Sequence, residues 1–312
     1  MENLLTVVIP IYNGEKYILR ALESLKNQTW KLFNILIIDD ASTDGTPSIV
    51  EQFAKYNKNS TLIRLSKNHG PSYCRNLGIK KCRTEYITFL DCDDWIDIDT
   101  YENCFKSIRP DSDILIFGLN YDYIDLDISE SKYVYNSNYS IEGNYALKIY
   151  GHTTKDSFKI TPIVNNKIYR LNLLLLNNIE FSNKLRFQED DIFTFKCLMF
   201  ASNVLFISRS KYHYFQNRDS VIHQVSELSV KHFVFAYKTL KDFLEKKSCF
   251  INYKTEFYLK FKASFKGKIH RIIKYSKNQE EANHLLSLLY KTVMETFNIE
   301  ELLSYFDFHQ LL

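Results

Sequence analysis

The amino-acid sequence predicts an α/β fold: a doubly wound, mixed and mainly parallel sheet with helices on both faces, followed by a C-terminal helical extension. Three observations lead to this prediction. Apolar runs typical of buried strands alternate with helical patterns over the first part of the chain. Polar segments rich in Asp, Asn, Ser or Gly follow the strand-like runs. After Val225 the pattern is helical to the end, without proline and with one glycine, Gly267.

The expected elements begin with a strand at Leu5 to Ile9, a continuous apolar run of the kind that is buried on both faces. Residues 15–28 carry apolar side chains at helical spacing, and 34–38 form a second strand. The turn sequence at 42–47 precedes a helix that ends near Tyr56. The next expected elements are a strand at 61–65, a helix at 71–82 and a strand at 85–90. Such crossovers produce parallel strands whose carboxyl ends bind ligands.

The following region mixes strands and helices. Its expected elements are strands at 114–118 and 132–135, helices at 171–176 and about 190–201, and short strands at 204–207 and 211–215. We therefore place a boundary near residue 220, with 221–312 as the helical extension.

Composition excludes several classes of function. The net charge is only +3, from 40 basic and 37 acidic residues, so we expect no nucleic-acid partner. The six cysteines include no CxxC pair and no zinc-ligand spacing, and we interpret them as reduced thiols of a cytoplasmic protein. The N-terminus lacks the features of a signal peptide, and no stretch reaches the roughly 18 apolar residues that span a bilayer. Any membrane attachment should be peripheral, at the inner face.

The strand at 85–90 is followed by an acidic segment. Asp91 and Asp93 stand at the strand end, where packed like charges are costly unless a cation compensates them. Oxygen ligands without Cys or His favour Mg²⁺ or Mn²⁺, held by one or two carboxylates and by phosphate oxygens. The alternative is a solvated acidic loop before a helix, which we favour for Asp97 and Asp99.

Two further acidic segments are candidates. Asp40 follows the second strand and can accept a hydrogen bond from a base, while Tyr12, after the first strand, offers a ring for stacking. Use in a turn or a helix cap is the alternative, which we favour for Ser42 and Asp44. Residues 189–191 are three acids that open a helix. They are either ordinary acids of a helix N-terminus or, beside a metal–nucleotide site, the source of a general base.

Four motifs occur in order along the first part of the chain. They read VVIPIYN at 7–13, IIDDASTDGT at 37–46, NHGPSYCRN at 68–76 and FLDCDD at 89–94. Together they resemble the motifs of family 2 glycosyltransferases, which are inverting, metal-dependent enzymes of the GT-A fold. The Glu189-Asp190 pair resembles the later Glu-Asp motif of that family and extends the resemblance to about residue 200.

The resemblance implies that 1–220 form a GT-A catalytic domain, in which 1–100 bind the nucleotide and 101–220 bind the acceptor. The implied substrate-binding residues are Pro10, Tyr12, Asn13, Asp40, Asn68, Arg75, Asp91 and Asp93. Among them, Pro10, Tyr12 and Asp40 would hold the uridine of a UDP-sugar. Asn68 and Arg75 would lie along the nucleotide and its diphosphate.

The resemblance also implies the metal-binding and catalytic residues. Asp91 and Asp93 would form the DxD motif, with Asp93 as the direct ligand of Mn²⁺ or Mg²⁺ and Asp91 as a contact to the ribose, the sugar or a bound water. Asp190 would be the catalytic base, and Glu189 would support it.

We therefore predict a metal-dependent inverting glycosyltransferase. It would move a monosaccharide from a UDP-sugar to a hydroxyl of a glycan or lipid-linked acceptor in surface polysaccharide biosynthesis. A sugar nucleotidyltransferase is one alternative, but it would need a Gly-, Lys- and Arg-rich loop after the first strand, and 11–16 contain one glycine. A non-catalytic nucleotide-sugar-binding or scaffolding module is the other, but it predicts damaged acidic motifs, whereas Asp91, Asp93 and Asp190 are all present.

Two groups of basic residues later in the chain are further candidates for function. His213 and Arg218 lie in the segment where many relatives carry an Arg or His. Residues 254–277 carry eight Lys and Arg side chains and one acid, interleaved with apolar residues. Such a helix can lie on an anionic membrane surface, as an enzyme with a lipid-linked acceptor needs. Alternatively, its apolar side packs on the catalytic domain or on a second subunit of a homo-oligomer.

Overall fold

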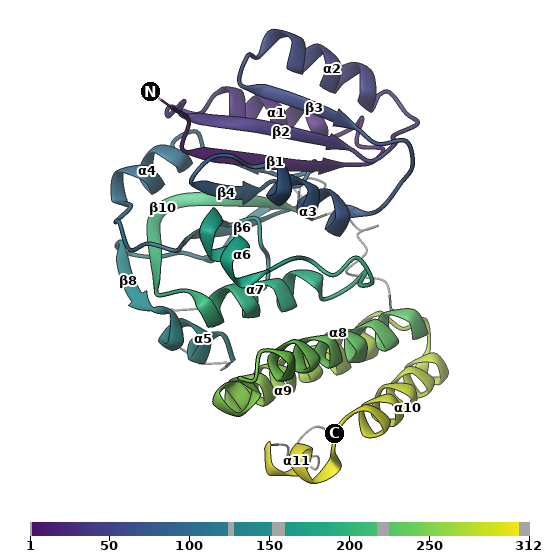
Figure 1. Cartoon of the computed structure of the whole chain (residues 1–312). Coiled ribbons are helices and arrows are strands. Elements are labelled where there is room, and N and C mark those ends of the chain that lie inside the picture. The colour runs from purple at the N-terminus through teal and green to yellow at the C-terminus, as the bar shows by residue number, and fades with distance from the viewer. Residues whose placement is uncertain (1, 124–127, 152–159, 217–224, 306–312) are drawn as a thin grey trace.

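The computed structural model describes residues 2–123, 128–151, 160–216 and 225–305. Within these ranges the chain forms a mixed sheet covered by helices, followed by a group of C-terminal helices (Figure 1). The predicted α/β fold class with a helical extension is therefore confirmed. The boundary near residue 220 falls outside the described residues and stays a prediction.

The sheet is built from two parallel parts joined by an antiparallel strand. Its strands are β1 (Leu5–Ile11), β2 (Phe33–Asp39), β3 (Ser60–Arg64), β4 (Tyr86–Phe89), β5 (Trp95–Ile96), β6 (Ile114–Tyr123), β7 (Ile128–Tyr133), β8 (Tyr139–Glu142), β9 (Lys167–Arg170) and β10 (Asn203–Phe215). The order is β3-β2-β1-β4-β9-β6-β10-β5, with β7 beside β6 and β8 beside β10. β3, β2, β1 and β4 are parallel, β9 runs antiparallel between β4 and β6, and β6 and β10 are again parallel.

Helices cover both faces of this sheet. They are α1 (Ile18–Lys26), α2 (Thr46–Tyr56), α3 (Pro71–Lys81), α4 (Thr100–Ser107), α5 (Gly143–Gly151), α6 (Leu171–Asn177) and α7 (Glu189–Phe200). Because side chains alternate along a strand, Val7 and Ile9 of β1 join the core cluster of α1 and α4, and Val8 joins that of α3 and α7. Gly78 allows α3 to approach β1 closely, since a Cβ there would lie 2.5 Å from a methyl carbon of Val8.

The structure differs from the sequence-based expectation in the second half of the sheet. The short strands expected at 204–207 and 211–215 are one strand, β10, whose register against β6 shifts between Ile207 and Lys211. Arg209 has a φ of 66° in this irregular stretch, so the polar residues 208–210 form a bulge and do not end the strand. The helix expected after Asp99 is α4, whereas the sequence does not predict β5, β8, β9 or α5, which are short or carry charges.

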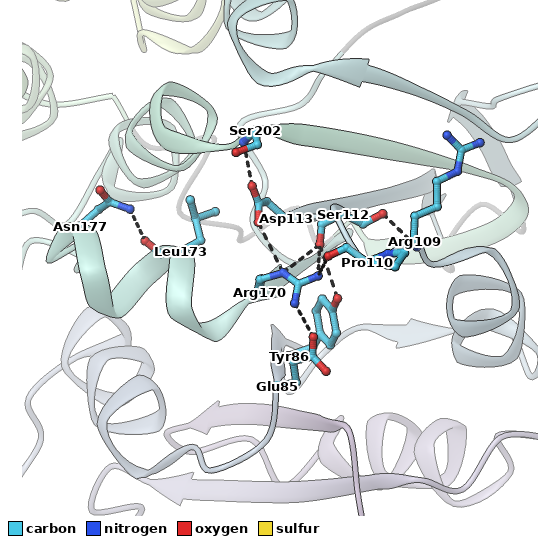
Figure 2. A network of polar contacts seen from close by, with 10 residues as sticks. All are labelled: Glu85, Tyr86, Arg109, Pro110, Ser112, Asp113, Arg170, Leu173, Asn177 and Ser202. Atoms are coloured by element: carbon cyan, nitrogen blue, oxygen red, sulfur yellow. Dashed lines mark hydrogen bonds and ion pairs between the residues drawn. The ribbon is translucent and has the colours of Figure 1, made fainter.

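β9 shows why such a strand is hard to predict from the sequence. It ends in the cation Arg170, whose acidic partners come from distant segments of the chain. The guanidinium of Arg170 contacts a group of acceptors around it: Glu85, the carbonyls of Pro110 and Ser112, and Asp113 (Figure 2). Asp113 also accepts the backbone N–H of Ser202 at 2.7 Å. Since Arg170 is in register with Tyr86, this network ties the sheet together at the start of β4.

The C-terminal extension packs directly on the helices that cover one face of the sheet. It consists of α8 (Glu227–Lys246), α9 (Phe250–Tyr275), α10 (Gln279–Thr296) and α11 (Ile299–Tyr305). Figure 1 shows α8 and α9 side by side next to α7. Phe233 of α8 and Phe261 of α9 belong to the same core cluster as Phe193 of α7. The extension and the sheet therefore share a continuous hydrophobic core.

A buried carboxylate reinforces this packing. Asp191 of α7, whose side chain is 4% exposed, lies 2.9 Å from the ammonium of Lys260 in α9. It also accepts hydrogen bonds from the hydroxyls of Tyr150 in α5, Tyr237 in α8 and Ser264 in α9. Burial alone would raise the pKa of Asp191, but Lys260 and these hydroxyls outweigh burial and lower it. Asp191 is thus ionised and joins four helices.

The basic segment 254–277 forms most of α9, and part of its charge faces inward. Lys260 and Lys268 are buried, and Lys254 pairs with Glu301 at 2.9 Å. The expectation that the apolar side of this segment packs on the preceding part of the chain is therefore confirmed. None of the described helices combines the length and the apolar character needed to cross a membrane.

Membrane contact by this segment stays a prediction, which now depends on the exposed side chains of Lys266, Lys274 and Lys277. We expect vesicles that contain anionic lipid to sediment the protein, and vesicles of neutral lipid to leave it in the supernatant. Protein that remains in the supernatant with both kinds of vesicle would contradict the contact.

We also predict that Asp191→Asn lowers the free energy of unfolding by about 3–5 kcal/mol, because it leaves Lys260 buried without its counter-charge. Urea unfolding at neutral pH measures this change. The lowered pKa means that the contribution of Asp191 is fully present above the ordinary carboxyl value of 3.8 and disappears as the pH falls through the folded value.

Two further variants control this prediction. Asp191→Asn combined with Lys260→Met should be more stable than Asp191→Asn alone, because no buried charge is left unpaired. Asp242→Asn, which removes an exposed pair with Lys238, should change the free energy by less than about 1 kcal/mol. A loss for Asp191→Asn no larger than for Asp242→Asn would contradict the stabilising role of the Asp191–Lys260 pair.

Candidate active site

The carboxyl ends of β1 and β2 carry loops that brace each other at one edge of the sheet. The backbone N–H of Asn13 donates to the hydroxyl of Ser42 at 2.9 Å, and the N–H of Thr43 donates to the Asn13 side-chain oxygen at 2.8 Å. Asn13 holds this turn with a φ of 51°. Asp44 accepts the N–H of Thr46 at 3.0 Å. The turn roles expected for Ser42 and Asp44 are confirmed.

Asp40 organises the loop that leads into α3. Its carboxylate, on a residue that is 2% exposed, accepts the N–H groups of His69 at 2.8 Å and Gly70 at 2.7 Å. A carboxylate offers about four lone-pair positions, so these two bonds leave acceptor capacity on Asp40. By fixing the start of α3, Asp40 also fixes the position of Arg75 in its second turn.

The other expected nucleotide contacts lie in the same loops. Pro10 is buried in β1, whereas Tyr12 is 49% exposed and Asn68 is also exposed. The residues expected to bind the nucleoside do not line the cavity described next: Pro10, Tyr12, Asn13, Asp40 and Asn68. Their roles in substrate binding stay predictions.

A cavity of about 510 Å³ lies where β4 ends and α7 begins. Asp91, Asp93, Glu189 and Asp190 line it together with Arg75. The Arg75 side chain is 5% exposed and joins both acidic motifs, with Nη2 2.9 Å from Asp91 Oδ1 and Nη1 3.3 Å from Asp190 Oδ1. The structure thus brings together the expected metal ligands and the expected base.

The carboxylates of this cavity outnumber its central cation. Burial raises the pKa of Asp190 to about 7, with Glu189 and Asp91 adding to the rise and Arg75 opposing it. Burial and the charge of Asp91 raise the pKa of Asp93 to about 6. The arrangement therefore favours an additional positive charge near Asp93 and leaves Asp190 able to exchange a proton near neutral pH.

Asp91 and Asp93 fit a hard divalent cation. Both present carboxylate oxygens to the cavity, and burial together with the charge of Asp91 raises the pKa of Asp93, a cost that a bound cation would offset. Across the described ranges, no group of three or more His, Cys, Asp or Glu side chains is arranged to hold a metal. A cation here would complete its coordination with water and phosphate oxygens, as Mg²⁺ commonly does beside nucleotides.

The acids that follow Asp91 and Asp93 have structural roles. Asp94 is fully buried, accepts the N–H of Phe215 at 2.8 Å and accepts the hydroxyl of Tyr212. Asp97 is partly exposed in the loop before α4, as expected, and it also lies 2.9 Å from His213, a contact that the sequence does not predict. These contacts hold the acidic segment against β10 and occupy His213, while Arg218 lies outside the described residues.

Sequence reasoning missed two sets of residues at this site. Arg186, Lys268 and Arg271 also line the cavity. Lys268 and Arg271 are spaced i, i+3 in the basic segment, which places them on one helix face, but the sequence does not show that this face meets the cavity. Lys167 is the other missed residue: it is buried and donates to the carbonyl of Thr161 at 2.9 Å, next to the lining segment 162–163.

Comparisons with known proteins give a family match and related sequences. The family described as "Glycosyl transferase family 2" matches residues 6–163. Glycosyltransferase GlyG of Streptococcus pneumoniae is 26% identical over 230 residues, which are 73% of this chain and 76% of GlyG. Poly(ribitol-phosphate) beta-N-acetylglucosaminyltransferase TarS of Staphylococcus aureus is 30% identical over 247 residues, 77% of this chain but 38% of TarS.

Solved structures show the same fold. TarS 1–349 in complex with UDP-GlcNAc has a TM-score of 0.61 at 19% identity, covering 93% of this chain and 89% of that one. The mannosyltransferase PcManGT of Pyrobaculum calidifontis, in complex with GDP-Man and Mn²⁺, has a TM-score of 0.56 at 14% identity, covering 95% and 89%. At such identities the likeness concerns the fold alone.

Proposed function

Because this chain belongs to glycosyl transferase family 2, we propose that it transfers a monosaccharide from a UDP-sugar to a hydroxyl of a glycan or lipid-linked acceptor, with inversion of configuration. The family and the GT-A-like fold make the chain a glycosyltransferase, which sets aside a nucleotidyltransferase and a non-catalytic binding module. The observation that carries the finer proposal is the single cavity in which Arg75 joins Asp91 to Asp190.

The donor and the biological role follow from the relatives. TarS has been solved with UDP-GlcNAc, which supports a UDP-sugar as the donor here. TarS is named for transfer to poly(ribitol-phosphate), and another relative is named a teichoic acid polymerase, which supports a role in assembling a surface polymer. A cytoplasmic location and homo-oligomer formation stay predictions.

The residues of the cavity divide the work of sugar transfer. Asp190 accepts the proton of the acceptor hydroxyl while the hydroxyl oxygen bonds to the anomeric carbon of the sugar. The bond from that carbon to the diphosphate oxygen breaks, and UDP leaves with its electron pair. Asp93, with Asp91, would hold Mn²⁺ or Mg²⁺, which when bound neutralises the negative charge that grows on the diphosphate. One base and no nucleophilic carboxylate give inversion.

Glu189 and Arg75 tune the base in opposite directions. The charge of Glu189 raises the pKa of Asp190 and so strengthens it as a base, whereas Arg75 lowers this pKa and keeps the carboxylate ionised near neutral pH. Arg75 also fixes the carboxylate in position through its contact at 3.3 Å. Arg75 is therefore a positioning residue for Asp190, besides its expected place along the diphosphate.

We predict that Asp93→Ala reduces metal-dependent UDP release from a UDP-sugar by about 10²–10³-fold, the effect of removing one electrostatic contact to a transition state. Binding of Mn²⁺ in the presence of UDP, followed by electron paramagnetic resonance, should weaken in parallel. Asp99→Ala is the matched control, because Asp99 belongs to the same acidic segment but does not line the cavity. Full metal-dependent turnover by Asp93→Ala would exclude the metal assignment.

For Asp190→Asn we predict unchanged UDP affinity and turnover lowered by about 10²–10⁴-fold, because the substitution removes the proton acceptor. Glu189→Gln should have a smaller effect, since Glu189 acts through its charge on Asp190. In the wild type, kcat/KM should rise with pH through about 7, where it reaches half its maximum, and level off at higher pH, because the base must be unprotonated. Wild-type turnover by Asp190→Asn would assign the base to another residue.

A further inference from the structure

The cavity has a basic part that the proposed reaction does not use. Arg186 lies in the loop before α7, and Lys268 and Arg271 lie on α9, whereas the donor-side residues come from α3 and the end of β4. Apolar side chains, including Phe187 and Phe233, line the cavity as well. The cavity therefore combines an acidic part around Asp190 with a cationic part contributed by the C-terminal extension.

These cations have no acidic partners among the residues that the structure describes. Within the described part of the chain, no carboxylate lies within 4.0 Å of the charged nitrogens of Arg186, Lys268 or Arg271, although such pairs form at many other Lys and Arg residues. Lys260, on the same helix as Lys268, illustrates the contrast through its pair with Asp191. The basic part thus carries positive charge that nothing in the described chain neutralises.

Lys268 gives the strongest argument that this part of the cavity binds an anion. The residue is 7% exposed, and its ammonium donates to the neutral hydroxyl of Ser229 at 2.8 Å. Burial, together with the neighbouring charge of Arg271, lowers the pKa of Lys268 to about 8. A buried ammonium without a carboxylate is costly, and a bound anion would relieve this cost.

We propose that Arg186, Lys268 and Arg271 form a subsite for a phosphate group of the acceptor, which places the acceptor hydroxyl at Asp190. This inference rests on the proposed function, because it takes Asp91 and Asp93 as the donor side of the cavity. Arginine and lysine are the side chains that bind phosphate through charge-assisted hydrogen bonds. An acceptor fixed by its phosphate meets the base in a defined orientation, which reduces the entropic part of the barrier.

Two kinds of acceptor share this chemistry: a polymer linked by phosphodiesters and a saccharide on a lipid diphosphate. Each repeat of the polymer carries a phosphate, and the first sugar of the lipid-linked saccharide adjoins the diphosphate. The experiment therefore uses one probe of each kind, sn-glycerol 3-phosphate and a short-chain, water-soluble prenyl diphosphate, with glycerol as the neutral control.

The test measures binding of these probes by calorimetry to the full chain saturated with UDP and Mn²⁺. UDP binding is recorded first, so a failure of the proposed function is seen as absent UDP binding before any probe is added. With the donor site filled, we expect at least one phosphate probe to bind and glycerol not to bind. The probe that binds more tightly identifies the kind of acceptor.

Variants on α9 decide whether the subsite is the one proposed. Arg271→Gln should weaken binding of the phosphate probe at least about tenfold and change UDP affinity less than twofold. Arg186→Gln should act in the same way. Lys266→Gln is the matched control, because Lys266 is exposed on the same helix and does not line the cavity. Circular dichroism confirms that each variant is folded.

Three results would overturn the proposal. The first is a UDP-loaded wild type that binds neither phosphate probe. The second is a loss of UDP affinity in Arg271→Gln, which would assign these cations to the donor diphosphate. The third is an equal loss of phosphate-probe affinity in Lys266→Gln and Arg271→Gln, which would indicate general attraction of the probe to a basic surface.

Discussion

The whole site depends on one buried guanidinium. Arg75 stands between Asp91 at the end of β4 and Asp190 at the start of α7, and without a cation these acids would repel one another across the cavity. Its position is set from two directions. Asp40 holds the loop that begins α3, and Gly78 lets the same helix lie directly on β1. The packing of one helix therefore determines where the charges of the site can meet.

The start of α7 uses neighbouring acids for opposite purposes. Successive residues of an α-helix point about 100° apart, so the adjacent carboxylates of Asp190 and Asp191 contact different neighbours. Asp190 faces the cavity, where burial raises its pKa, and Asp191 faces the core, where Lys260 lowers the pKa of Asp191. The C-terminal extension is thus attached next to the residue proposed as the base. Any loosening of α9 would therefore change the position of Asp190.

The same extension gives the cavity its second chemical character. Lys260 uses its charge inside the fold, whereas Lys268 and Arg271, on the same helix, lie at the cavity and have no carboxylate partner among the described residues. A cavity with carboxylates in one part and, among the described residues, cations without carboxylate partners in another suits a donor bound through a metal ion and an acceptor that carries its own negative charge. We infer that sheet and extension together define what the enzyme binds, the sheet on the donor side and the helices on the acceptor side.

The sequence by itself determined the strand–helix order and which polar loops follow the strands. It also singled out Asp91, Asp93 and Asp190 as candidate site residues, because periodicity and local motifs are properties of neighbouring residues. Only the tertiary structure decided that Arg75 joins two of these acids, that Asp97 pairs with His213 and that β9 lies at the centre of the sheet. It also decided which lysines of α9 face the core and which face the cavity. The physical reason is that charge pairing acts across space between distant segments, and a pattern of residues records which charges exist but not which of them meet.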